Sequence, residues 1–308
     1  MITENLPYLK KTFQNKLHNY KIIFKKFESQ KSLKKFLIKK NFYAIYCSFG
    51  IKIDSSIFNN KENYPKFLIS PTTGLDHIDL NFCKKNNIKV LSLKNHRLFL
   101  KNITATAELT WAIILNLAKN LKKYSEETSL KLKWDRDKYL NNDLKGNTIG
   151  IIGYGRIGRI ISKYAKAFGM KVFIYDIRNK KSSKLKDILK CKFITIHISL
   201  DNNCKIFSKL FFSKIRKDAF LINTSRGDIF NEKYFIKFFK SKKYNGLGLD
   251  VLPSDVIWKN KIPKKYQFIK NLNSNFVLTP HIGGNTLETR LKTTEFILSN
   301  FLKFEKLI

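Results

Sequence analysis

The chain has 308 residues, 43% of them hydrophobic, which is enough for two domains with cores of their own. It carries 60 basic and 23 acidic residues, a formal net charge of +37, but the lysines are spread along the whole sequence and arginine is scarce. Arginine is the residue that forms bidentate hydrogen bonds with phosphates and with base edges, and it is scarce here. We therefore interpret the positive charge as compositional drift, which would attract anionic ligands at long range. A nucleic-acid binder is the alternative, which salt-sensitive DNA binding would support.

Targeting signals and disulfide patterns are both missing from the sequence as we read it. Residues 1–5 lead into a Lys-rich amphipathic stretch instead of an apolar signal, and we find no apolar run long enough to cross a bilayer. The cysteines show no C-x-x-C spacing, as in a reducing compartment. We therefore expect a cytoplasmic protein without membrane partners or a metal site. The cysteines are Cys47, Cys83, Cys191 and Cys204.

The first hundred residues alternate between short apolar runs and helical or loop segments. Residues 42–47, 66–70 and 89–93 are predicted strands, and residues 32–37 a helix before the first of them. This alternation predicts a small parallel α/β unit. A helix is predicted over residues 104–121, where apolar residues cover much of the circumference, so it should be buried between domains.

A glycine pattern near the middle of the chain predicts a dinucleotide site. Residues 153–158 read G-x-G-x-x-G between a predicted strand (147–152) and a helical stretch that ends at Gly169. Such a loop lays a pyrophosphate on a helix N-terminus. Asp176 ends the next predicted strand, where a carboxylate accepts hydrogen bonds from the adenosine ribose and repels a 2′-phosphate. NAD is thus favoured over NADP, although Arg178 keeps NADP open.

Polar residues follow three later strands of the same predicted sheet. Arg226, Asp250 with Asp255, and His281 come at successive carboxyl ends, where α/β proteins bind ligands. Arginine can orient a carboxylate and polarise the neighbouring carbonyl. Histidine can take or give the alcohol proton while a hydride moves to or from nicotinamide, and a carboxylate behind it favours the imidazolium. The strands are predicted at residues 193–197, 219–223, 246–250 and 276–279, before an amphipathic helix over 287–304.

Ordered motifs along nearly the whole chain resemble the D-isomer-specific 2-hydroxyacid dehydrogenases, a family that includes D-3-phosphoglycerate, glycerate and D-lactate dehydrogenases. The resemblance implies a doubly wound α/β Rossmann domain (101–284) inserted into a smaller flavodoxin-like α/β substrate domain (1–100), with 285–308 as the return helix. The motifs are residues 70–79, 106–111, 134–136, 144–146 before the glycine loop, 197–200, 223–227, 249–251 and 279–284.

The resemblance also implies roles for individual residues. Arg226 would orient the substrate, His281 would be the acid–base residue and Asp255 its carboxylate partner. Asp250 would hold the nicotinamide carboxamide, and Asp176 the ribose. The substrate carboxylate would be bound by Ser48, Phe49, Gly50, Thr73 and Gly74. The cofactor would be bound by Thr110, Gly153, Gly155, Arg156, Ile157, Gly158, Asp176, His197, Ile198, Ser199, Thr224, Ser225, Asp250, His281 and Gly283.

Some of these residues have a simpler interpretation. We interpret His197 as a structural or cleft-lining residue instead of a catalyst, and Trp111 as core or dimer packing. Asp76, His77 and Asp79 are interpreted as loop and helix-start residues.

One departure from the family concerns Asp255, where the family usually has glutamate. The side chain is one methylene shorter, so we expect it to fall short of a direct hydrogen bond to His281 unless the backbone shifts or a water bridges, with an activity optimum at lower pH. Residues 201–203 and 256–263 also depart from the family's usual sequence, which predicts a different access for substrate.

These observations predict a cytoplasmic, homodimeric NAD-dependent D-2-hydroxyacid dehydrogenase, with D-3-phosphoglycerate as the leading substrate. The sequence ends at Ile308 without a C-terminal regulatory segment, so we expect no serine feedback through one. The alternative is a catalytically weak, NAD(H)-sensing corepressor of the same fold, which the intact Arg226 and His281 argue against.

Overall fold

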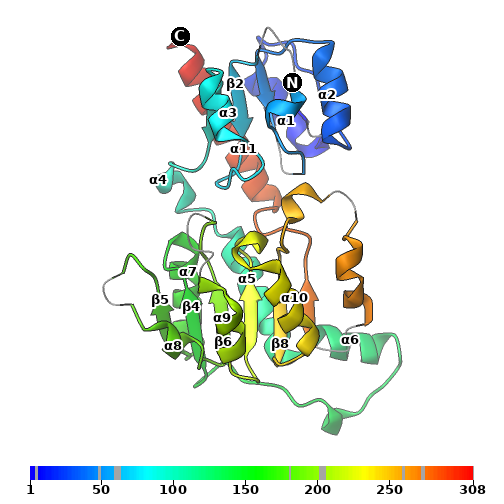
Figure 1. Cartoon of the computed structure of the whole chain (residues 1–308), viewed down its shortest axis with the longest axis vertical. Helices are drawn as coiled ribbons and strands as arrows, with labels where there is room; N and C mark the ends of the chain where they lie inside the picture. Colours follow the sequence, from blue (N-terminus) through cyan, green and yellow to red (C-terminus); the bar gives the residue numbers. More distant parts are fainter. Residues whose placement is uncertain are drawn as a thin grey trace. The chain divides into compact units, whose positions relative to one another are not determined.

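A computed structural model of the chain describes residues 1–3, 6–47, 50–58, 64–179, 182–200, 206–258, 261–271 and 275–307 (Figure 1). Its contacts form two compact units. The first comprises Met1–Ile103, Val256–Pro263 and Asn285–Ile308, and the second comprises Thr104–Asp255 and Lys264–Gly284. In chain order the second unit lies inside the first. Residues 256–263, which the sequence analysis assigns to the nucleotide-binding part, group with the first unit.

The first unit is built on a parallel sheet of order β1-β2-β3. Successive residues of β2 point to opposite faces. Phe67 and Ile69 join the core made with α1 and α11, whereas Leu68 joins the core made with α2 and α3. Both faces are therefore covered, as parallel sheets require. Its elements are α1 (Pro7–Lys16), α2 (Gln30–Ile38), β1 (Ala44–Tyr46), β2 (Phe67–Ser70), α3 (Leu80–Lys85), β3 (Lys89–Ser92), α4 (Arg97–Leu100) and α11 (Leu287–Glu305).

The second unit holds a six-stranded parallel sheet of order β5-β4-β6-β7-β8-β9. The chain runs outward from β4 to β5 and then returns to β6 on the other side of β4, so the strand order reverses there. Figure 1 shows α9 and α10 in front of the sheet and α5 behind it. The strands are β4 (Thr148–Ile152), β5 (Lys171–Tyr175), β6 (Phe193–Ile196), β7 (Phe220–Asn223), β8 (Gly246–Leu249) and β9 (Phe276–Leu278). The helices are α5 (Ala105–Lys119), α6 (Leu121–Ser129), α7 (Arg156–Ala167), α8 (Leu185–Ile188), α9 (Lys209–Lys214) and α10 (Glu232–Ser241).

Helix α5 corrects two expectations. The predicted helix over 104–121 is interrupted at Asn120, whose left-handed backbone (φ 51°) ends α5 before α6 begins. Residues Arg97–Lys119 are also long and apolar enough, by length and composition alone, to cross a membrane, contrary to our reading of the sequence. Core packing accounts for the apolar character of α5, since Trp111, Ile114 and Leu117 are buried in the core of the second unit.

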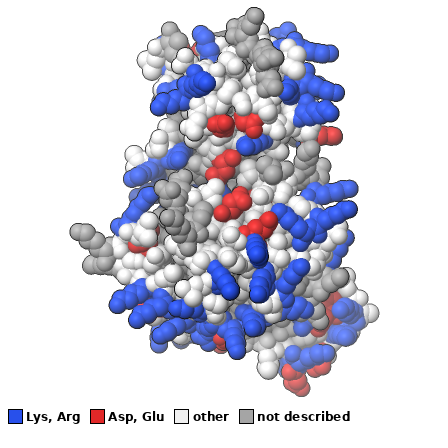
Figure 2. Space-filling view, in the orientation of Figure 1, with Lys and Arg blue, Asp and Glu red and all other residues white. Residues whose placement is uncertain are grey.

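Lys and Arg side chains cover much of the visible face. Figure 2 also shows several Asp and Glu side chains gathered in a band near the middle of that face. Burial raises the pKa of the Cys83 and Cys191 thiols to about 11. Cys47 is also buried and unbridged, and Cys204 lies outside the described residues.

Candidate active site

A cavity lies in the second unit at the point where the strand order reverses. Its walls are the loops that follow β4, β5 and β6, which is the position where open α/β sheets bind ligands. The lining residues are Ile152, Gly153, Gly155, Tyr175, Asp176, Ile177, Arg178, His197, Ile198, Ser199 and Ile206.

The three glycines of the loop differ in what surrounds them. A Cβ on Gly158 would lie 2.0 Å from the carbonyl oxygen of Gly153, and one on Gly153 (φ 92°) would lie 2.4 Å from that of His197. A Cβ on Gly155 would meet no protein atom within 4 Å. Gly155 is also the N-cap of α7, whose first amides have no partner within the helix. Two glycines thus permit close packing, and the third leaves the helix N-terminus open to an anion.

Asp176 joins the glycine loop to the end of β5. Its Oδ2 accepts the amide of Tyr154 at 2.6 Å, and its Oδ1 accepts the amide of Arg178 at 2.8 Å. The carboxylate lines the cavity and keeps acceptor capacity beyond these two bonds. The residues around the cavity therefore fit a dinucleotide, with an open amide cradle for the pyrophosphate and a held carboxylate for the ribose.

His197 lines the same cavity in a fixed orientation. Its amide donates to the carbonyl of Ile152 at 2.7 Å, and its Nε2 lies 2.9 Å from Thr195 Oγ1. Burial lowers the pKa of His197 to about 3. The ring is thus neutral near pH 7, which agrees with our interpretation of His197 as a lining residue.

The turn after β7 carries Arg226 and is held by the side chain of Asn223. The Oδ1 of Asn223 accepts the amide and hydroxyl of Ser225 at 3.0 and 2.7 Å, and its Nδ2 donates to the carbonyl of Arg226 at 2.9 Å. Thr224 contacts α5 through a 2.7 Å hydrogen bond between its hydroxyl and that of Thr110. Asn223 therefore sets the direction in which Arg226 leaves the sheet.

Asp250 holds the turn that carries His281. Its carbonyl accepts the amide of His281 at 2.8 Å, while its carboxylate accepts the amides of Ile282 and Gly283 at 2.8 Å and the hydroxyl of Thr279 at 2.6 Å. His281 has a left-handed backbone (φ 55°), which a non-glycine residue adopts at a cost. Burial raises the pKa of Asp250, although its hydrogen bonds oppose that shift.

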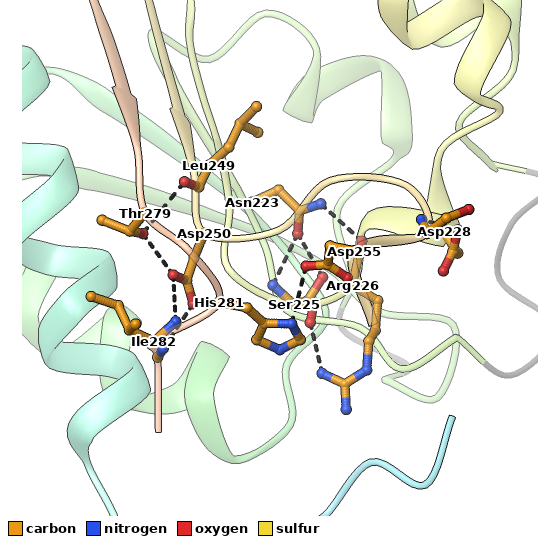
Figure 3. Close-up of polar contacts among 12 residues, drawn as sticks. Asn223, Ser225, Arg226, Asp228, Leu249, Asp250, Asp255, Thr279, His281 and Ile282 are labelled. Carbon is orange, nitrogen blue, oxygen red and sulfur yellow. Dashed lines mark hydrogen bonds and ion pairs between the residues drawn. The ribbon is translucent and has the colours of Figure 1, made fainter. Parts of the chain in front are cut away.

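Asp255 lies beside His281. Its Oδ2 is 3.0 Å from His281 Nδ1, an ion-pair distance, but among the described residues this oxygen accepts no hydrogen bond, so the expected lack of a direct hydrogen bond is confirmed. Ser254 takes a left-handed conformation (φ 65°) just before the 3-10 turn Asp255–Ile257. Figure 3 shows the carboxylate of Asp255 beside the imidazole of His281. The guanidinium of Arg226 lies on the same side of that imidazole.

The residues predicted to bind the substrate carboxylate belong to the first unit. Ser48 and Phe49 lie outside the described residues. Gly50 follows β1 with φ 97°, and Thr73 and Gly74 follow β2. The hydroxyl of Thr72 donates to the carbonyl of Gly74 at 2.7 Å, which shapes that loop. The binding roles of these residues stay predictions.

Sequence reasoning missed the residues that support the site. Asn223 ends β7, and Thr279 directly follows β9. Both lie inside the motifs named above, so their place at the carboxyl ends of strands could have indicated a supporting role. Ser254 and its partner Asp228, described below, carried no such signal.

Comparison with known proteins decides the family. Residues 111–283 match the family described as D-isomer specific 2-hydroxyacid dehydrogenase, NAD binding domain. The chain belongs to this family. It is therefore an NAD-dependent oxidoreductase that acts on D-2-hydroxy acids.

Individual relatives carry different names. A glyoxylate reductase of Thermococcus litoralis is 29% identical over 83% of this chain and 78% of its own length. A D-3-phosphoglycerate dehydrogenase of Bacillus subtilis is 27% identical over 86% of this chain but only 50% of its own length. A D-lactate dehydrogenase structure from Aquifex aeolicus, complexed with NAD and lactic acid, superposes with a TM-score of 0.80 at 25% identity, over 99% of this chain and 94% of that one.

Proposed function

We propose that this enzyme exchanges a hydride between NAD and a small D-2-hydroxy acid or its 2-keto acid by means of Arg226, His281 and Asp255. The contact between His281 Nδ1 and Asp255 Oδ2 (3.0 Å) carries the proposal. It holds the imidazole ring so that Nε2 can face the reacting oxygen. The site is polar where an alcohol must lose or gain a proton, and it adjoins a dinucleotide cavity at neighbouring strand ends of the same sheet.

Each residue would have a separate role in the reaction. Arg226 pairs with the substrate carboxylate and polarises the carbonyl. His281 gives the proton from Nε2 to the carbonyl oxygen during reduction and takes it back during oxidation. When bound, the nicotinamide supplies or accepts the hydride. In the cofactor cavity, the amides of residues 155–157 would hold the pyrophosphate, and Asp176 would hold the ribose.

For the substrate, we propose D-3-phosphoglycerate as the first candidate. Relatives named D-3-phosphoglycerate dehydrogenase and the net charge of +37, which favours a doubly anionic ligand, support it. Glyoxylate is the second candidate, since the relative that this chain matches over 78% of its length is a glyoxylate reductase.

The test is NADH oxidation by the purified protein with 3-phosphohydroxypyruvate, glyoxylate and pyruvate, and with His281→Asn as control. We expect turnover with one of them and loss of turnover in the variant. Tight NADH binding without turnover on any keto acid would support the sensor alternative instead.

We also propose that the enzyme is a homodimer through the second unit. Residues 130–140 expose four large apolar side chains, which a monomer seldom leaves in water. Trp134→Glu is expected to lower the apparent mass in sedimentation, whereas Leu210→Glu on α9 is the matched control. An unchanged mass in both variants would contradict this interface. The exposed fractions are 78% for Leu130, 86% for Leu132, 87% for Trp134 and 85% for Leu140.

A further inference from the structure

The short loop before Asp255 is held in an unfavourable conformation. Ser254 has φ 65°, and the amide of Asp255 donates to the carbonyl of Leu252 at 3.0 Å, which closes the β-turn 252–255 just before the 3-10 turn. A non-glycine residue stays in the left-handed region only where its surroundings hold it. Because this turn sets the distance from the Asp255 carboxylate to His281, whatever holds Ser254 also positions that pair.

The group that holds Ser254 is the carboxylate of Asp228. Asp228 Oδ1 accepts the amide of Ser254 at 2.8 Å, across 26 positions of sequence. A carboxylate is a stronger acceptor for a backbone amide than a neutral group. Asp228 lies in the turn Gly227–Ile229, directly after Arg226.

A second contact joins the same two loops. A Cβ on Gly227 would lie 2.0 Å from the carbonyl carbon and oxygen of Leu252 and 2.5 Å from the nitrogen of Pro253, so the two backbones touch. The loop that carries Arg226 and the loop that leads to Asp255 are thus fixed to each other both by packing and by the Asp228–Ser254 hydrogen bond. Figure 3 shows Asp228 and Arg226 on the same turn.

Other charged groups lie close to these loops. The buried hydroxyl of Tyr266 donates to Glu232 Oε1 at 2.8 Å, and Lys265 Nζ lies 2.6 Å from the same oxygen. Burial, followed by Glu232, Asp228 and Asp255, raises the pKa of the Tyr266 phenol. The carboxylates of Asp228 and Asp255 thus both act by charge on the Tyr266 phenol. A test of Asp228 must therefore separate its charge from its hydrogen bond to Ser254.

We propose that Asp228 is a positioning residue for the Asp255–His281 pair. Its hydrogen bond fixes the left-handed turn at Ser254, and that turn brings an aspartate, one methylene shorter than glutamate, to the imidazole. The inference rests on the proposed function, in which His281 moves the proton.

The experiment compares Asp228→Ala with Asp228→Asn in steady-state reduction of the active keto acid. Asparagine keeps an oxygen for the Ser254 amide but removes the charge, whereas alanine removes both. We expect Asp228→Ala to lower kcat by about 10-fold or more, part of the roughly 10²- to 10⁴-fold that a positioned acid–base group contributes. The pH–rate profile should change as well, because the imidazole loses the carboxylate that lies 3.0 Å from its Nδ1. Asp228→Asn should restore most of both properties, and KM for NADH should stay unchanged in both.

Two further variants make the result decisive. Asp228 is exposed, so its replacement leaves no cavity in the core and the variant should fold. Asp143→Ala, which removes an acid that is 86% exposed elsewhere in the second unit, is the matched control. In a Ser254→Gly background, Asp228→Ala should cost less, because glycine adopts the left-handed turn without help.

The outcomes separate the inference from the proposed function. If His281→Asn retains activity, the proposed function is wrong, whatever Asp228 does. If His281→Asn is inactive while Asp228→Ala keeps the kcat and pH profile of the parent, only the positioning role is overturned. Equal losses in Asp228→Ala and Asp228→Asn would also overturn it, since they would point to charge alone. Should Asp228→Ala not fold, the Asp228→Asn profile and the Ser254→Gly comparison still decide.

Discussion

The carbonyl oxygen of Asp250 accepts the amide of His281 at 2.8 Å, and the carboxylate of the same residue accepts the next two amides. One side chain thus fixes the backbone that carries His281. The resemblance to the family assigned Asp250 to the nicotinamide carboxamide. One acceptor position on Oδ2 is compatible with that role, but in the described structure the residue first of all shapes the turn.

We therefore expect Asp250→Asn to lower both stability and activity. The amide group would place a donor against the amide of Ile282 or Gly283, which costs about 1–3 kcal/mol for an unmatched buried group. Urea unfolding and kcat should fall together. Thr279→Val, which removes one of the three donors to this carboxylate, is the milder control. An Asp250→Asn protein with the parent's unfolding midpoint would contradict the role in the turn.

Arg226→Lys should strongly lower kcat/KM although it keeps the positive charge. Lysine lacks the planar fork that pairs with a carboxylate, so kcat/KM for the keto acid should drop by about 10²- to 10³-fold while NADH binding is kept. Arg216→Lys, at an ion pair with Asp218 on the surface, provides the comparison and should leave kcat/KM within about twofold. Similar effects at both arginines would mean that Arg226 does not contact the substrate.

The glycine loop allows binding to be separated from folding. Gly155→Ala adds a methyl group where no protein atom lies within 4 Å, so it should raise the Kd of NADH without a change in Tm. Gly158→Ala places a methyl group 2.0 Å from a carbonyl oxygen and should lower Tm as well. Calorimetry and NADH fluorescence measure the two effects. A Gly155→Ala protein that binds NADH normally would show that the pyrophosphate is not bound at this helix end.

His197 predicts a particular dependence of stability on pH. The pKa of His197 falls from 6.5 to about 3 on folding. Below pH 6.5 the unfolded chain therefore binds a proton at His197 that the folded protein does not bind. The folded state should lose stability as the pH decreases from 6.5 toward the folded pKa, and His197→Gln should remove that part of the loss. Urea unfolding at several pH values tests this. A difference between parent and variant that is the same at pH 5 and pH 7.5 would contradict the neutral, buried ring.

The strands and their order can largely be predicted from the sequence. Every predicted strand overlaps an observed one, because buried parallel strands are short continuous apolar runs between glycines and polar turns, as at Phe193–Ile196 and Phe220–Asn223. The order of the strands then brings Arg226, Asp250 and His281 to one edge of a sheet. Periodicity and topology were sufficient for these features.

Local backbone conformation could not be predicted in the same way. Nothing in the residue types of Ser254 or His281 indicates a left-handed backbone, since both are held there by distant groups, Asp228 and Asp250. Side-chain length alone therefore could not predict that Asp255 Oδ2 lies within 3.0 Å of His281 Nδ1. The missing information was tertiary, because it lies in hydrogen bonds between loops far apart in sequence.

The strand ladder continues past the last assigned strand residues into the site. The amide of Asp250 donates to the carbonyl of Asn223 at 3.0 Å, and the amide of His281 donates to that of Asp250. In hydrogen exchange, these two amides should therefore exchange with the slow protons of the central strands instead of with the surface loops. The backbone amide of His281 would then exchange only when the sheet itself opens, so the turn that carries His281 should be as stable as the core of the sheet.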